Sequence, residues 1–123
     1  MTDMVNHPPH YNAYSVEVIE VTRHCSFNIG NAIKYMLRHL HKGKSQEDLE
    51  KALWYLRDHV EHFHKYDTGS LGQEWYGNLL TLTNEYYQQP GSLDGVASAL
   101  SFLISGSARM AAVCLSTVVE PKK

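Results

Sequence analysis

The residues best suited to chemistry are basic side chains in a stretch that no acidic residue interrupts, from Asn28 to Lys44. The cations of this stretch are Lys34, Arg38, Lys42 and Lys44. The first three recur every four residues, so on a helix they lie along one side. Positive side chains gathered without acidic neighbours in the sequence indicate a site for a small anion, such as a phosphate group.

A second row of polar residues follows within residues 45–66, at steps of four, three and four: Lys51, Tyr55, Asp58 and His62. If both stretches are helices that lie side by side, the two polar rows meet. The side chains then expected around one small volume are Lys34, Arg38, Lys51 and Tyr55. The sequence therefore predicts an anion site to which two helices contribute cations.

Apolar residues recur at helical spacing through both stretches and predict two amphipathic helices. Those of the first are Ile29, Ala32, Ile33, Met36, Leu37 and Leu40, and those of the second are Leu49, Ala52, Leu53, Leu56, Val60 and Phe63. Asn28 is the candidate N-cap of the first helix, and Ser45 with Asp48 resembles a capping box for the second. The connection 41–44, with Gly43, is short enough to force an antiparallel hairpin.

The hairpin follows an N-terminal region with two parts. Paired prolines within residues 6–14 fix the backbone and favour an extended segment. Ser15 then begins a short segment up to His24 that we interpret as a helix, although its β-branched residues are also typical of a strand.

Histidines at two places have spacings that suit metal ligands. His7 and His10 form an H-x-x-H pair, but no acidic or cysteine partner lies near them, so we expect their rings to pack on the helices. His59, His62 and His64 lie near the end of the second hairpin helix, where cationic side chains are favoured. We expect a solvated histidine cluster there and predict no metal site.

The chain after residue 70 predicts two further helices. One spans residues 73–89 and is ended by Pro90, and a long apolar helix begins near Ser92. The last helix is apolar nearly all round, so it must be covered, which predicts a homo-oligomer; a self-contained monomeric bundle is the alternative. Arg109, the single charge of residues 95–119, needs either an ion pair or a bound phosphate, and Gly106 could mark a kink.

Length indicates one domain over residues 1–123. The helical patterns predict that it is all-α, with a central antiparallel hairpin, a short N-terminal helix and two C-terminal helices. The net charge of −2 and the pI near 6.4 argue against a duplex nucleic-acid partner. No signal peptide is recognisable, residues 95–119 are too polar for a membrane span, and Cys25 and Cys114 suit buried free thiols. We therefore expect a cytoplasmic protein without a membrane partner.

Four sequence stretches recur in this order and spacing in a known family: NHPPHY (6–11), VEVIEV (16–21), FNIGNAIKYMLRHLHKG (27–43) and DLEKALWYL (48–56). Residues 5–58 thus resemble a family of small bacteriophage proteins of mostly unknown function. It includes a coliphage nucleoside monophosphate kinase and the lactococcal phage SaV protein, which is tied to sensitivity to a host abortive-infection system. The resemblance makes residues 5–66 the core and 70–123 a C-terminal extension.

The resemblance to the kinase implies a nucleotide-phosphate site in the core. The residues that it would place at the site are His10, Tyr11, Asn31, Lys34, Tyr35, Arg38, Lys51 and Tyr55. Arg109 lies outside the resemblance and is added as the candidate phosphate ligand of the last helix.

Two functions of different classes fit these residues. A nucleoside monophosphate kinase would use the cations to neutralise phosphates, Asn31 and Tyr55 to orient them, and Asp58 to assist the acceptor or Mg²⁺. It would need ATP, but the chain has no G-x-x-x-x-G-K-[ST] loop and no catalytic residue can be assigned. A binding protein would instead sequester a host immune nucleotide signal, or contact a host defence protein, without turnover.

Overall fold

A computed structural model describes residues 13–41, 43–63 and 73–121, and this part of the chain is helical without strands. Its helices are α1 (Ile19–Thr22), α2 (Phe27–Arg38), α3 (Ser45–His62), α4 (Gln73–Gln88), α5 (Asp94–Ile104) and α6 (Ala108–Val119). The predicted all-α class is confirmed. The N-terminal segment is helical as expected, although α1 is shorter than the predicted stretch.

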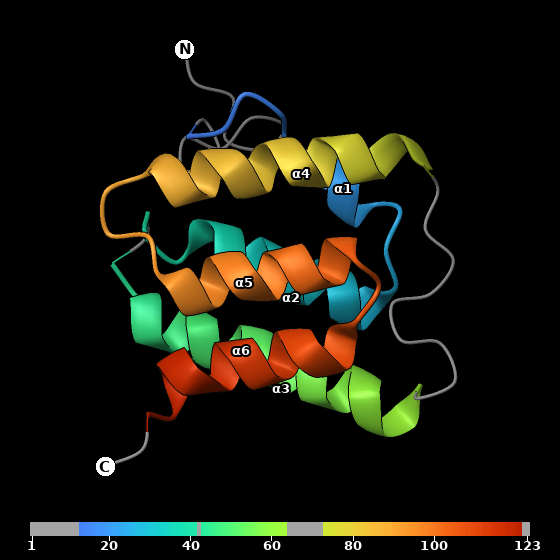
Figure 1. Ribbon diagram of the computed structural model, residues 1–123, viewed down its shortest axis with the longest axis vertical. Coiled ribbons are helices and arrows are strands. Elements are labelled where there is room, and N and C mark those ends of the chain that lie inside the picture. The colour runs from blue at the N-terminus through green and yellow to red at the C-terminus, as the bar shows by residue number, and fades with distance from the viewer. Residues whose placement is uncertain (1–12, 42, 64–72, 122–123) are drawn as a thin grey trace.

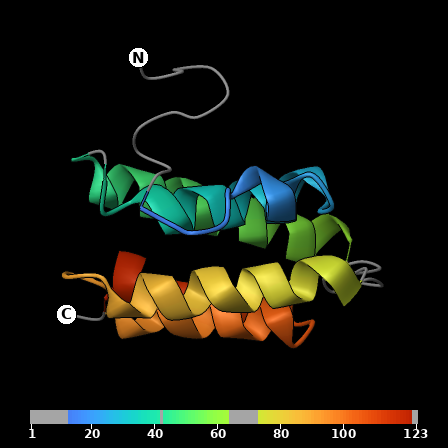
Figure 2. The ribbon, with the colours of Figure 1, turned by 90° about the horizontal axis from the view of Figure 1, so that it is seen from above.

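The helices form two layers, which Figure 2 shows edge-on. The first layer contains α1 and the α2–α3 hairpin, and the second contains α4, α5 and α6, with α5 between the other two (Figure 1). The layers are joined where α1 packs on α4 and where α3 packs on α6. None of the described helices combines the length and the apolar character that a membrane crossing requires.

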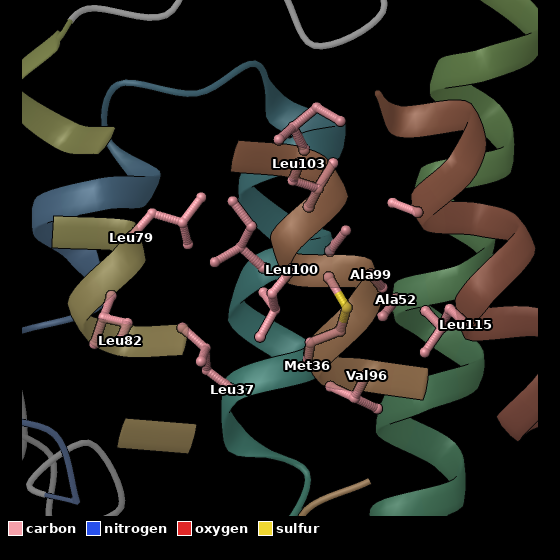
Figure 3. Packing of buried hydrophobic residues seen from close by; sticks show 14 of the residues in the cluster. Met36, Leu37, Ala52, Leu79, Leu82, Val96, Ala99, Leu100, Leu103 and Leu115 are labelled. Atoms are coloured by element: carbon pink, nitrogen blue, oxygen red, sulfur yellow. The ribbon is translucent and has the colours of Figure 1, made fainter. Parts of the chain in front are cut away.

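The core lies between the two layers, and apolar side chains from both fill it (Figure 3). Met36 and Leu37 of α2 are fully buried, as are Leu82 of α4 and Leu100 of α5. Truncating one such buried leucine to alanine typically costs about 2–5 kcal/mol, so this contact fixes the hairpin firmly against the second layer. The polar rows of α2 and α3 are therefore held on the opposite side of their helices.

Both predicted helix caps of the hairpin are wrong. The N-cap of α2 is Ser26, whose Oγ accepts a hydrogen bond from the Ile29 amide, so Asn28 lies inside the first turn. The α3 helix begins at Ser45 after Lys44, without a side-chain cap. Ser45 instead binds the side chain of His39, the C-cap of α2, and Asp48 binds that of Arg38, the last residue of α2.

The long apolar helix predicted near the C-terminus is two helices. Gly106 has a positive φ of 91°, which ends α5, and the Ser107 hydroxyl caps α6 by accepting from the Met110 amide at 3.1 Å. The α6 helix folds back on α5 at very short range, since a Cβ at Gly95 would lie 2.3 Å from Val118 Cγ2. Much of the apolar surface is thus covered within the chain, and homo-oligomerisation stays a prediction.

Candidate functional site

Three cations from two helices gather around the ring of Tyr35. The Lys34 Nζ and the Arg38 Cζ each lie 4.6 Å from the ring centre, and the Lys51 Nζ lies 5.4 Å from it. The Tyr35 ring stacks on Tyr55 with 6.1 Å between centres and an interplanar angle of 7°. We call these five residues the Tyr35 platform.

The platform is a consequence of helical periodicity in both helices of the hairpin. On α2, Lys34, Tyr35 and Arg38 lie on the side opposite the buried stripe that contains Ile33 and Met36. The apolar stripe turns toward the second layer, so the polar side of α2 meets the polar row of α3. The convergence expected from the sequence is therefore present in the structure.

Arg38 is held by a carboxylate beneath the platform. Its Nη2 lies 3.3 Å from Asp48 Oδ1 and its Nε 3.4 Å from Asp48 Oδ2, so the guanidinium faces both oxygens. The Asp48 side chain is only 3% exposed, whereas that of Arg38 is 17% exposed. Such a two-point contact fixes the orientation of the guanidinium and neutralises part of its charge.

Lys51 has a carboxylate partner as well, but at the surface. Its Nζ lies 3.2 Å from Glu47 Oε1. This hydrogen bond lowers the pKa of Glu47 and raises the pKa of Lys51, with Lys44 also lowering that of Glu47. The three cations of the platform and their two carboxylates leave a net charge of one, and Lys44 nearby adds a second positive charge.

Two side chains that were expected to orient or assist a ligand make other contacts. The Asn31 amide donates to the Phe27 carbonyl at 2.8 Å, within α2. The Asp58 carboxylate accepts from the Asn28 amide at 2.8 Å and lies 3.2 Å from the His62 ring. The backbone carbonyl and the charge of Asp58 both raise the pKa of His62. Asp58 therefore fastens α2 to α3.

Two exposed aromatic rings extend the platform, and the sequence reasoning missed them. Phe27 is 74% exposed and Trp54 is 61% exposed. Their ring centres lie 5.8 Å and 5.2 Å from that of Tyr55, in edge-on contacts. Phe27 is two turns before Lys34 on the same side of α2. A large aromatic residue at a position of the polar helix face is unusual, and this position in the sequence could have indicated an exposed ring.

Other candidate residues lie elsewhere. Arg109 is exposed in the first turn of α6, in the second layer, and is not one of the cations around Tyr35. His10 and Tyr11, like Lys42, His7 and His64, fall outside the described residues.

The prediction of a solvated histidine cluster is wrong for His59, which is only 3% exposed. It lies one turn before His62 on the side of α3 that faces the core, so packing excludes it from water. Within the described ranges, no three or more His, Cys, Asp or Glu side chains are grouped to hold a metal ion.

A buried polar network behind the platform locks α4 to the hairpin. The His39 ring, 1% exposed, bonds through Nδ1 to Ser45 Oγ and through Nε2 to the Tyr86 hydroxyl, both at 2.7 Å. That hydroxyl also accepts from the Leu93 amide at 3.0 Å. Burial lowers the pKa of His39 to about 4 and raises that of Tyr86 to about 12, so both are neutral near pH 7.

Two surface hollows border the hairpin and the second layer. A groove of about 490 Å³ runs between α4 and α5, and its lining includes Tyr87 and several serines. A smaller hollow of about 330 Å³ lies between α3 and the end of α6, beside Trp54. Its acidic lining residues are Glu50, Asp58, Glu61 and Glu120. Arg57 also lines this hollow and pairs with Glu120, so the hollow keeps a net negative charge and suits a phosphate less well than the Tyr35 platform does.

Comparison with known proteins adds one finding. Residues 5–57 match a protein family described as a protein of unknown function, DUF3310. The match includes the whole Tyr35 platform and does not extend to α4, α5 or α6. No curated protein and no solved structure matches the chain.

Proposed function

We propose that the Tyr35 platform binds the phosphate of a nucleotide or a nucleotide-derived ligand. The observation that carries the proposal is the gathering of Lys34, Arg38 and Lys51, from two helices, around one aromatic ring. Three donors with separate approaches can contact several oxygens of one phosphate group, and charged hydrogen bonds of this kind are worth about 1.5–3 kcal/mol each.

The aromatic members of the platform support a nucleotide rather than an inorganic anion. Tyr35 and Tyr55 lie directly beside the cations, and an aromatic ring is a natural partner for a nucleobase. The resemblance of residues 5–58 to a bacteriophage family with a nucleoside monophosphate kinase points to the same ligand class.

Binding without turnover is the version of this function that the contacts favour. The carboxylates of Asp48 and Glu47 are already bound to the platform cations Arg38 and Lys51, and that of Asp58 is bound to Asn28. A kinase would need ATP and Mg²⁺, and carboxylates engaged in holding the fold are poorly suited to position the metal ion. A phage protein of this kind would capture a nucleotide signal of the host defence.

Isothermal titration with a nucleoside monophosphate tests the proposal. Lys34→Ala should weaken binding about tenfold, because Lys34 is the platform cation without a carboxylate partner among the ion pairs described. Arg23→Ala is the matched control, since it removes an exposed cation at the C-cap of α1. Equal affinities of the wild type and both variants would show that the Tyr35 platform does not bind the phosphate. Product formation with ATP and Mg²⁺ would show that the ligand is turned over.

A further inference from the structure

Phe27 and Trp54 offer two separate stacking surfaces on the polar side of the hairpin. Phe27 is 74% exposed and Trp54 is 61% exposed, and each ring meets the Tyr55 ring at a steep interplanar angle, 74° and 88°. Each residue therefore offers aromatic surface to a planar partner. Bases of single-stranded nucleic acids use aromatic rings in this way.

The spacing of the two rings suits more than one base. Their distances of 5.8 Å and 5.2 Å from Tyr55 limit the separation of their centres to at most the sum of the two, 11.0 Å. Neighbouring nucleotides of one strand can span such a distance and can therefore reach both rings. A ligand with linked bases can use both exposed rings at once.

The charge of the platform suits phosphodiesters. Arg38 and Lys51 already have carboxylate partners, so the platform has a net charge of one, and Lys44 makes it two. A phosphodiester carries one negative charge, whereas a triphosphate would bring more charge than the platform balances. Trp54 itself lines the acidic hollow, so a base on its ring requires the linking phosphate to lie toward the platform cations, away from Glu50 and Glu61.

We infer that this face binds a short single strand of DNA or RNA, with bases on Phe27 and Trp54 and the linking phosphodiesters at the cations. The inference rests on the proposed function, because it uses the same cations, and it adds the class of nucleotide ligand. A pI near 6.4 is compatible with it, since stacking supplies part of the affinity and no long basic track is needed.

Intrinsic fluorescence reports binding at this face. The chain has two tryptophans, and Trp54 is exposed while Trp75 is 2% exposed. Titration with the thymidine tetranucleotide (dT)₄ should quench Trp54 and should give an affinity at least tenfold above that of thymidine monophosphate. Inorganic pyrophosphate is the probe without a base, and it should leave the Trp54 emission unchanged.

Phe27→Ala and Trp54→Ala test the stacking directly. Each should weaken binding of fluorescently labelled (dT)₄, followed by anisotropy, about five- to hundredfold. Tyr87→Ala is the matched control, because it removes a 60% exposed ring from α4 in the second layer. With two phosphates at the cations, log Kd should rise with log salt at a slope of about 1.4.

The outcomes separate this inference from the proposed function. Equal affinities for the monophosphate and the tetranucleotide, or full affinity in both alanine variants, would overturn the single-strand inference while phosphate binding stands. If neither nucleotide nor pyrophosphate binds the folded protein, the proposed function and the inference both fall.

Discussion

Removing the Arg38 side chain should destabilise the fold as well as the site. At 3.3 Å and an effective dielectric constant of about 20, the attraction between Arg38 and Asp48 is about 5 kcal/mol before desolvation is counted. The Asp48 side chain is only 3% exposed, so truncating Arg38 leaves a carboxylate inside the protein without this partner. Because Arg38 is partly in water, we expect Arg38→Ala to cost about 3 kcal/mol, the low end for a broken buried pair.

Urea unfolding followed by circular dichroism measures this cost, and Arg57→Ala is the control. Arg57 contacts Glu120 at only 2.7 Å, but both side chains are more than half exposed, so its loss should cost less than about 1 kcal/mol. Adding Asp48→Asn to Arg38→Ala should recover part of the stability, since the buried charge is then gone. Equal costs for the two arginine variants would refute the reasoning from burial.

Two other predictions concern stability. His39 has a pKa of about 4 in the folded state, whereas an unfolded histidine takes up a proton below about pH 6.5. The free energy of unfolding should therefore fall as the pH is lowered through this window, by about 2 kcal/mol between pH 7.5 and 5. His39→Gln should lack this contribution in urea unfolding at the two pH values, and an unchanged pH dependence would contradict it. Gly95→Ala should lower the thermal midpoint although alanine favours helices, because the new Cβ would meet Val118 at 2.3 Å, and an unchanged or raised midpoint would show that α6 can shift.

The hairpin was predictable because local signals agree there. Apolar spacing, a short connection with Gly43 and a polar row on each helix all indicate the same antiparallel pair. The buried stripes of α2 and α3 follow the predicted positions except at Phe63, which comes after the end of α3 and is 51% exposed. Helical periodicity also placed Lys34, Arg38 and Lys51 close to one another. These features depend only on residue spacing, which the sequence contains.

The features that the sequence did not reveal depend on contacts between distant segments. Asp48 has the spacing of a capping residue, and only the position of α2 makes it the partner of Arg38. Asp58 was expected to assist an acceptor or a metal ion, and only the structure shows that its carboxylate accepts a hydrogen bond from Asn28. In the sequence, Gly106 is compatible with a kinked helix or with a reversal of the chain direction. The packing of α6 against α5 shows that the chain reverses there.

The most direct test of the account is a nuclear magnetic resonance titration of the ¹⁵N-labelled protein with a nucleoside monophosphate. Binding at the Tyr35 platform predicts that the largest amide shift changes fall in residues 34–38 of α2 and 47–55 of α3. Changes centred on the groove between α4 and α5, or no changes at saturating ligand, would contradict the claim that the cations around Tyr35 hold a phosphate.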